Sequence, residues 1–191
     1  MTTLAAIQGD GWAVIGCDSR ASDEGGRYLE MATQKIVNNN GVLIAGAGAS
    51  RGSNILQFGW TPPKPPITYD LNALDKFMTR KFIPEMRKAF QDAGYEGKED
   101  GTAAEHDSIF LVAIRGVIYP VYGDYSWDRE ARRIYYAGSG GDIALGALEL
   151  QNYEKISTPA AAEKAIRRAI EAAIKHDIYS GGKIITHIQE A

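Results

Sequence analysis

Residues 2–18 read TTLAAIQGDGWAVIGCD, two apolar runs separated by a Gly-Asp-Gly turn. An Asp-Gly pair between apolar flanks is typical of a tight β-hairpin. We therefore predict two antiparallel strands, over residues 3–8 and 12–17. This pairing places Thr2 at the mouth of the hairpin and Asp18 at the end of the strand that pairs with the Thr2 strand.

Thr2 would gain unusual chemistry if Met1 were removed. A threonine at the start of a chain carries a hydroxyl and a free α-amine, so one residue supplies both a nucleophile and a base. An α-amine titrates near pH 8 (about 7.7–8.0 in model compounds), so much of it is neutral at neutral pH and no catalytic histidine is required. Methionine is readily trimmed before a small residue. Because Met-Thr-Thr is also an ordinary chain start, the argument depends on the remaining residues.

The rest of the chain continues the pattern of paired strands, with helices between the pairs. Apolar runs bounded by turn residues predict further strands over residues 35–37, 41–45, 109–115, 117–122, 133–137 and 183–188. Apolar residues at steps of three and four, with cap and stop signals, predict helices over residues 50–58, 70–93, 141–152 and 158–176. Pro84 is expected to bend the second helix. A proline-rich connector is expected at 61–66 and a polar surface loop at 96–107.

The order of these elements indicates the fold class. The predicted order along the chain is a group of strands, two helices, a second group of strands, two helices and a last strand. This order lacks the regular alternation of βαβ units, so we expect antiparallel sheets with helices packed outside them. The continuous apolar run at 109–114 indicates strands that are covered on both faces. Two stacked sheets between helical layers satisfy both observations. With 191 residues, the chain is predicted to form a single α+β domain, residues 1–191.

Composition and charge argue against several classes of function. Hydrophobic residues make up 45% of the chain and charged residues 24%, as in soluble globular proteins. The net charge of −3 and the scattered basic residues give little support to nucleic-acid binding. The longest apolar run, at 109–114, is far shorter than the roughly 20 residues of a membrane helix, and the chain start lacks a targeting pattern. We expect a cytoplasmic protein that binds neither nucleic acid nor membrane.

Neither a metal nor a cofactor is expected. The single cysteine, Cys17, has no partner for a disulfide or a cysteine-based metal site and is expected to fill the core. The histidines, His106, His176 and His187, lack metal-ligand spacing. The glycine-rich segments lack the lysine of a phosphate loop and the flanking βαβ unit of a dinucleotide fold.

A nucleophile built on Thr2 needs help, because a threonine hydroxyl is only weakly nucleophilic. Such a site requires a cation that favours the alkoxide, a carboxylate that holds the cation, and donors for an oxyanion. Asp18 and Lys35 are candidates for the pair: Lys35 is a lone cation directly before an apolar strand. The Asp18-Ser19-Arg20 segment could equally be an ordinary strand end and turn.

Six short motifs occur in the same order, and with nearly the same spacing, as in one protein family. The chain resembles the β subunit of the 20S proteasome and its bacterial or phage-type relatives in Thr2-Thr3, Gly16-Cys17-Asp18-Ser19-Arg20-Ala21, Gln34-Lys35-Ile36, Ala45-Gly46, Gly138-Ser139-Gly140 and Asp177-Ile178-Tyr179-Ser180-Gly181-Gly182. The resemblance implies an N-terminal nucleophile (Ntn) hydrolase with an αββα sandwich fold. It also implies a homo-oligomeric ring that encloses its active sites, unfolded polypeptide as substrate, and an ATP-dependent unfoldase as partner.

The resemblance also implies roles for individual residues. Thr2 would be the nucleophile and its α-amine the base, with Asp18 and Lys35 tuning it. The remaining implied site residues are Ser139, Asp177 and Ser180 around the amine, Gly46 or Gly48 as the oxyanion donor, and Arg20 and Gly181 beside the substrate. Ser139 is expected to cap the helix that follows it. Asp177 is expected at a helix C-terminus, where an anion is unfavourable, and this placement favours a functional role.

The sequence therefore predicts a threonine endopeptidase that works through a Thr2 acyl-enzyme ester. Two alternatives remain at this point. One is a structural ring subunit that keeps the fold without activity, although an idle site has no need of a buried cation and two carboxylates. The other is an Ntn amidase that acts on small amides with the same nucleophile.

Overall fold

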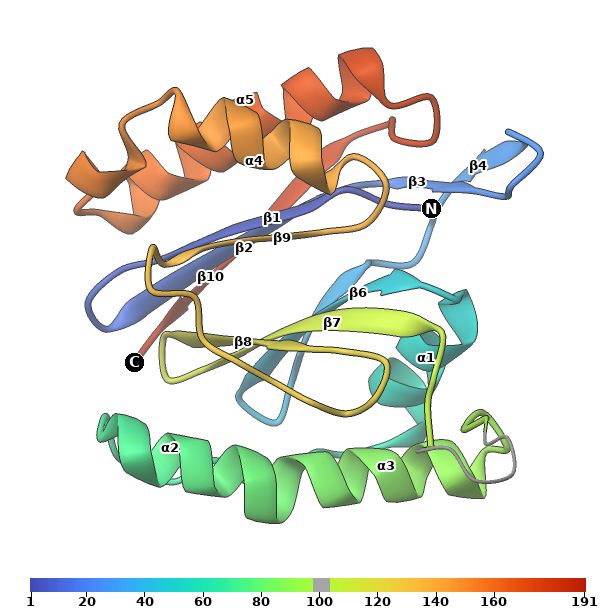
Figure 1. Ribbon diagram of the computed structural model, residues 1–191, viewed down its shortest axis with the longest axis vertical. Helices are drawn as coiled ribbons and strands as arrows, with labels where there is room; N and C mark the ends of the chain where they lie inside the picture. Colours follow the sequence, from blue (N-terminus) through green and yellow to red (C-terminus); the bar gives the residue numbers. More distant parts are fainter. Residues whose placement is uncertain (98–103) are drawn as a thin grey trace.

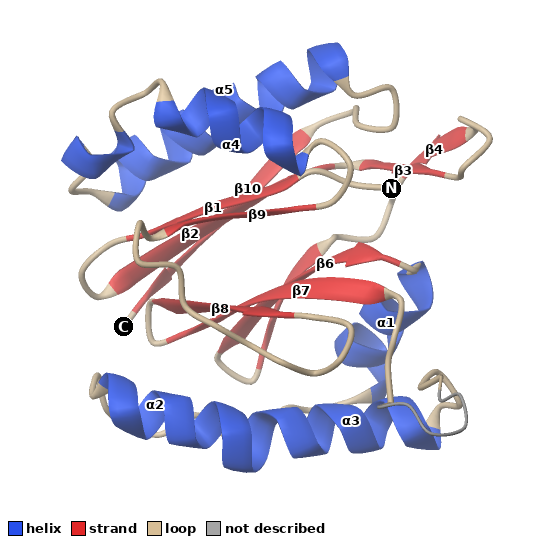
Figure 2. Ribbon diagram, viewed as in Figure 1, coloured by secondary structure: helices blue, strands red, loops and turns tan. Residues whose placement is uncertain are grey.

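The computed structural model describes residues 1–97 and 104–191. Its elements form four layers, in which two β-sheets face one another between two layers of helices (Figure 1). Figure 2 shows the same arrangement, with both sheets in red and the helices in blue outside them. This architecture confirms the predicted αββα sandwich. Residues 98–103 of the loop predicted at 96–107 lie outside the described residues.

The first sheet is built around the predicted N-terminal hairpin. Its strand order is β10 (Ile184–Glu190), β2 (Trp12–Asp18), β1 (Leu4–Gln8) and β9 (Ile134–Ala137). All neighbours are antiparallel, and the hairpin register runs from Leu4 opposite Cys17 to Gln8 opposite Ala13. Strands from the second half of the chain therefore flank the hairpin that carries Thr2 and Asp18.

The second sheet is also antiparallel. Its strand order is β5 (Ile36–Asn39), β6 (Val42–Gly48), β7 (Ser108–Ile114) and β8 (Val117–Val121). The predicted strands at 35–37, 41–45, 109–115 and 117–122 correspond to these four elements within a few residues. The side chains of β6 and β7 are almost all buried because this sheet is covered on both faces.

One small hairpin was not predicted. Strands β3 (Arg20–Ser22) and β4 (Tyr28–Glu30) pair with each other and project beyond the first sheet (Figure 1). Each strand has only three residues, and β4 is exposed throughout. Such a short, exposed pair has no apolar alternation by which the sequence could reveal it.

The helices cover the outer faces of the sheets. Their bounds are α1 (Ser50–Asn54), α2 (Leu71–Phe77), α3 (Ile83–Asp92), α4 (Gly141–Glu149) and α5 (Pro159–His176). The 3-10 turn Tyr153–Lys155 follows α4. Asp70 caps α2 by accepting from two backbone N–H groups, and Thr158 caps α5. None of the described helices combines the length and the apolar composition that crossing a membrane needs.

Pro84 does not end the helical rod formed by α2 and α3. A π-helical stretch, Met78–Phe82, joins the two helices and ends two residues before the proline. Proline cannot donate the usual backbone hydrogen bond and crowds the carbonyl four residues earlier. A π-helical stretch changes the hydrogen-bond spacing, so the expected disturbance takes the form of a wider turn. A second π-helical stretch, Ile55–Gly59, extends α1 to the end of the predicted helix at 50–58.

Three apolar clusters hold the layers together. Leu4, Ile15, Leu43 and Leu111 are among the residues buried between the two sheets. The outer helices bury their own stripes, which are Ala162, Ile166 and Ile170 on α5, and Leu74, Met78, Phe82, Met86 and Phe90 along α2 and α3. These stripes have the three- and four-residue spacing from which the helices were predicted.

Two glutamines add polar contacts between the sheets. Gln8 of β1 accepts a hydrogen bond from the backbone N–H of Ile118 at 2.8 Å. Gln189 of β10 accepts from the N–H of Gly116 at 3.0 Å and donates to the carbonyl of Ala113 at 3.0 Å. Both side chains thereby join the first sheet to the β7–β8 hairpin of the second.

The contact between α5 and the first sheet depends on Gly16 in β2. A Cβ atom at this position would lie 2.4 Å from Ile166 Cγ2 and 3.0 Å from Ile170 Cδ1. We expect Gly16→Ala to destabilise the protein by about 1–3 kcal/mol, because overpacking pushes α5 off the sheet. Urea denaturation would measure this change.

The matched control is Gly146→Ala in α4, where a Cβ atom would meet nothing within 4 Å. Alanine is favoured over glycine inside a helix by roughly 0.5–1 kcal/mol, so this variant should be slightly stabilised. Equal stability of the two variants would contradict the packing described for Gly16.

Candidate active site

Thr2 lies two residues before the start of β1 and is only 6% exposed. Its hydroxyl donates a hydrogen bond to the carbonyl oxygen of Met1 at 2.8 Å. Thr2 also lines a cavity of about 250 Å³, together with Lys35, Gly46 and Gly48. The folded chain thus brings the start of β1 and the edge of the second sheet to one cavity.

Asp18 and Lys35 form a buried ion pair beside this cavity. Lys35 Nζ lies 2.8 Å from Asp18 Oδ1, and the two side chains are 5% and 0% exposed. Asp18 is the last residue of β2, and Lys35 directly precedes β5, so each sheet contributes one partner. Lys35 also donates to the carbonyl oxygen of Arg20. The structure therefore places this pair next to Thr2, where the sequence analysis expected it.

The Asp18 carboxylate gathers backbone donors from separate parts of the chain. Oδ1 accepts from the N–H of Thr3 at 2.9 Å, while Oδ2 accepts from the N–H groups of Gly181 at 3.0 Å and Arg20 at 3.3 Å. A buried charge is tolerated only when it is paired and hydrogen-bonded. These donors together with Lys35 satisfy that condition.

A second polar cluster centres on Asp177. Its Oδ2 accepts from the hydroxyls of Ser180 at 2.6 Å and Ser139 at 2.7 Å. Ser180 is also 2.5 Å from the hydroxyl of Thr3. Asp177 is the C-cap of α5, as expected, and the cluster brings together residues 38 positions apart in the sequence.

The expectation that Ser139 caps a helix is wrong. Helix α4 begins at Gly141, its N-cap is Gly140, and no side chain caps it. Ser139 donates its hydroxyl to Asp177 instead. A charge-assisted hydrogen bond to a carboxylate is stronger than one between neutral groups, which explains why the hydroxyl turns away from the helix end.

Thr3 is the residue that the sequence analysis missed. It is fully buried, and it joins the two clusters, because its N–H donates to Asp18 while its hydroxyl contacts Ser180. A polar residue at the start of an otherwise apolar strand was the available signal. Its partners lie 15 and 177 residues away, so the sequence did not identify them.

The pairing of β6 with β7 determines which way Gly46 and Gly48 point. Just beyond the strand, the N–H of Ala49 donates to the carbonyl of Asp107 at 2.8 Å. Hydrogen-bonding positions alternate along an antiparallel strand. The N–H groups of Gly46 and Gly48 therefore point away from β7, toward the side of the sheet where β5 lies.

The two glycines differ in what lies on that side. Gly46 falls opposite Lys35 when the β5–β6 register is continued, whereas Gly48 extends beyond the first residue of β5. Gly48 has a φ of +113°, and a Cβ atom there would lie 2.3 Å from the carbonyl oxygen of Asp107. Only glycine fits this position, and its N–H lies outside the β5–β6 ladder.

Arg20 and Gly181 contact each other. A Cβ atom on Gly181 would lie 2.2 Å from Arg20 Cζ, so the guanidinium occupies the space that a side chain would fill. Arg20 also lies over the ring of Tyr28, 4.0 Å from its centroid, and 3.6 Å from Glu30. Among the described residues that line the cavity beside Thr2, neither Arg20 nor Gly181 is included. Their backbones hold Asp18, as described above.

Electrostatics at the chain start favour a neutral amine. The Met1 amine donates to the carbonyl oxygen of Ser22 at 2.6 Å. Burial lowers the pKa of this amine, and the nearby positive charge of Lys35 lowers it further, while Asp18 and Asp177 act in the opposite direction. Burial also raises the pKa of the Cys17 thiol to about 12, as is typical of an unreactive core cysteine.

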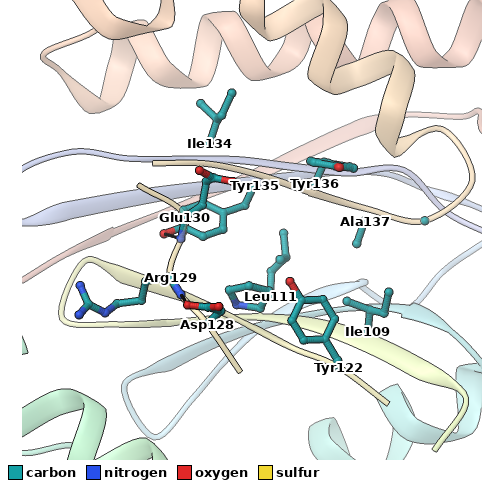
Figure 3. A pocket seen from close by; sticks show the side chains of 12 residues that line it. Ile109, Leu111, Tyr122, Asp128, Arg129, Glu130, Ile134, Tyr135, Tyr136 and Ala137 are labelled. Carbon is teal, nitrogen blue, oxygen red and sulfur yellow. Dashed lines mark hydrogen bonds between the residues drawn. The ribbon is translucent and has the colours of Figure 1, made fainter. Parts of the chain in front are cut away.

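A larger hollow of about 430 Å³ lies between β9 and the β7–β8 hairpin (Figure 3). Two of its charged side chains have structural partners: Glu130 pairs with Arg132, and Arg129 pairs with Asp75. The Tyr135 hydroxyl contacts the Gln8 side chain at 3.3 Å. Among residues 1–97 and 104–191, no group of three His, Cys, Asp or Glu side chains could hold a metal ion. The cavity beside Thr2 is therefore the candidate active site.

Comparison with solved structures identifies the fold. Thiobacillus denitrificans BPH superposes with a TM-score of 0.70 and 20% identity, over 99% of this chain and 98% of its own. The same values hold for that protein in complex with epoxomicin. Eukaryotic HslV from Trypanosoma brucei gives a TM-score of 0.66 and 18% identity, over 100% of both chains. This chain has the proteasome-type Ntn hydrolase fold.

The Ntn hydrolase fold confirms the predicted resemblance at the level of architecture, over the whole length of the chain. No protein-family model matches the sequence, and no curated protein matches it. The structural comparison thus finds relatives over the whole chain where the comparisons with family models and curated sequences find none.

Loss of Lys35 should strongly destabilise the protein. Lys35→Met would leave the buried Asp18 carboxylate without its cation, at a cost of about 3–5 kcal/mol. The double variant Asp18→Asn/Lys35→Met should recover part of this loss, because it removes the unpaired charge. Urea denaturation of the variants and the parent protein would measure both effects.

Arg132→Met serves as the control, because Arg132 forms an exposed ion pair with Glu149 and should change stability little. A Lys35→Met variant as stable as this control would contradict the electrostatic account of the Asp18–Lys35 pair.

Proposed function

We propose that this chain is a threonine peptidase of the proteasome type that uses Thr2 as its nucleophile once Met1 has been removed. The Thr2 hydroxyl oxygen attacks the carbonyl carbon of a peptide bond, and the free α-amine takes the hydroxyl proton. The amine then passes this proton to the leaving amino group, which leaves an acyl ester on Thr2. Water activated by the same amine hydrolyses the ester.

The main support for this proposal is that Thr2 and Lys35 line the same cavity, and that Lys35 is paired with the buried Asp18. A lysine ammonium has three N–H groups. Asp18 and the Arg20 carbonyl accept two of them. The third is left for the oxygen of Thr2, where a positive charge lowers the cost of forming an alkoxide.

Removal of Met1 is required because the nitrogen of Thr2 is an amide while Met1 is attached. Burial and the charge of Lys35 lower the pKa of the Met1 amine. The new Thr2 amine would lie one residue closer to the buried pair, so the same two influences act on it. A base with a lowered pKa is already neutral at physiological pH, as proton abstraction requires.

Gly48 is the better candidate for the oxyanion donor. Its N–H lies beyond the start of β5, and Gly48 lines the cavity with Thr2. The N–H of Gly46 faces the backbone of Lys35 in the continued β5–β6 register. A donor that is free of the sheet can stabilise the negative oxygen of a tetrahedral intermediate.

The Asp177 cluster is proposed to orient the amine end of Thr2. Asp177, Ser139 and Ser180 are linked by short hydrogen bonds, and Ser180 contacts Thr3, the next residue in the chain. The charge of Asp177 also acts on the pKa of the Met1 amine. Positioning of this kind keeps the nitrogen lone pair aligned with the hydroxyl.

A homo-oligomeric ring that receives unfolded polypeptide, with an ATP-dependent unfoldase as partner, is the assembly we propose. Its support is the full-length match to two proteasome-like folds. Native mass spectrometry and electron microscopy of the purified protein would test the ring. A strictly monomeric protein would contradict this part of the proposal without affecting the chemistry of Thr2.

Two experiments test the nucleophile. Intact mass should show loss of one methionine, and a β-lactone probe should label Thr2 in the trimmed protein. Thr2→Ala should lose the label and peptide hydrolysis. Epoxomicin, which is bound in one structure of the bacterial neighbour, is a second probe. Peptide cleavage by Thr2→Ala, or full activity with Met1 retained, would disprove the mechanism.

The pH dependence of hydrolysis tests the base. Only the neutral amine can accept a proton, so kcat/KM should fall as the pH drops below the amine pKa. We expect the acid limb to lie below the ordinary value of about 7.7–8.0, because burial and Lys35 disfavour the charged amine. Thr2→Ser keeps the amine, so the acid limb of its pH profile should have the same midpoint. A midpoint above the ordinary amine pKa would contradict the assignment of the amine as the base.

A further inference from the structure

One wall of the cavity beside Thr2 is a polar face of a single helical segment. Ser50, Ser53, Asn54 and Gln57 all line the cavity, and they come from α1 and the π-helical stretch that extends it. Their spacing of three and four residues places them on one side of the helix. Leu56 of the same segment is fully buried in the core. The helix thus presents hydroxyl and amide groups to the cavity.

A second wall adds groups of the same character. Ser22, Thr33 and Gln34 line it, with Met31 and Ala21 beside them. The Gln57 amide donates to the carbonyl oxygen of Gln34 at 2.9 Å, which links the two walls.

Charge is nearly absent from the side chains that face this space. Of the described lining residues, Lys35 alone has a charged side chain, and its ammonium is held by Asp18 and the Arg20 carbonyl. No aspartate or glutamate is among those residues. An entering ammonium would therefore lose its water without gaining an opposite charge, and an entering carboxylate would find only Lys35, whose ammonium is already paired with Asp18.

Met1 indicates which part of a substrate would enter the cavity. Its carbonyl oxygen is 2.8 Å from the Thr2 hydroxyl oxygen, and Met1 itself lines the cavity. A substrate residue whose carbonyl carbon is attacked by Thr2 must bring its carbonyl equally close. The side chain of this residue, here called the acyl residue, then lies at the same cavity.

We propose that this cavity selects peptides whose acyl residue has a short, uncharged polar side chain, namely Asn, Gln, Ser or Thr. The inference builds on the proposed function and adds its substrate class. Hydroxyl and amide groups such as those of Ser53 and Asn54 would be left without partners by an apolar side chain, and sites built on hydrogen bonds reject such analogues.

The test is a set of fluorogenic tetrapeptide amides that differ only at the acyl residue, assayed with protein whose mass shows loss of Met1. We expect kcat/KM for Gln and Asn to exceed that for the similarly sized Leu, and for Glu and Lys, by roughly tenfold. Preference for Leu, Phe, Glu or Lys would overturn the inference.

A variant with one polar wall group replaced sharpens the test. Asn54→Leu should lower the ratio of Gln to Leu turnover by roughly fivefold to tenfold, because it replaces an amide by an apolar group of similar size. Asn72→Leu is the matched control, since it makes the same change at an exposed position of α2 and should leave the ratio unchanged. An unchanged ratio in Asn54→Leu would overturn the role of this wall.

Failure of the inference is distinguishable from failure of the proposed function. If Thr2 is labelled by the β-lactone and cleavage requires Thr2, but apolar or charged acyl residues are preferred, only the substrate class is wrong. If no peptide is cleaved and Thr2 is not labelled, the proposed function fails, and the substrate inference falls with it.

Discussion

The buried ion pair of Asp18 and Lys35 is the constraint around which this end of the molecule is arranged. A carboxylate without solvent exposure must be fully compensated, and here the partners come from the residue before β1, the first residue of β3, the residue before β5 and the loop before β10. Four separate segments are held at fixed distances by one side chain. This arrangement also fixes the position of Thr2, because the N–H of the next residue, Thr3, donates directly to Asp18.

The parts of this structure that follow local rules could be predicted from the sequence. The hairpin of β1 and β2 is encoded by an Asp-Gly turn between apolar runs, and α5 by the Thr158 cap and an apolar stripe. Antiparallel pairing then places Asp18 beside the chain start. Lys35 was a candidate partner of Asp18 because it is a lone cation directly before an apolar strand, and the family resemblance implied the same pairing, which the structure contains.

Features that depend on distant partners could not be derived in this way. The hydroxyl of Ser139 has a helix start beside it, yet it turns to Asp177, which is 38 residues away. Thr3 looked like the first residue of a strand, and its role appears only when Ser180 is brought to it. The proposed preference for Gly48 over Gly46 depends on the β5–β6 register, which shows where β5 begins.

The two glutamines between the sheets have a consequence for reactivity. Gln8 and Gln189 join the two sheets through backbone groups of the β7–β8 hairpin, whereas the proposed reactive groups are divided between the sheets, with Thr2 on one and Lys35 on the other. In the proposed mechanism, the separation of the layers therefore sets the distance over which the charge of Lys35 acts on the oxygen of Thr2. Reaction rates can change a hundredfold with a displacement of about 1 Å. A force or contact that changes the distance between the two sheets would therefore change the rate of the proposed reaction, even when it acts on the far side of the molecule.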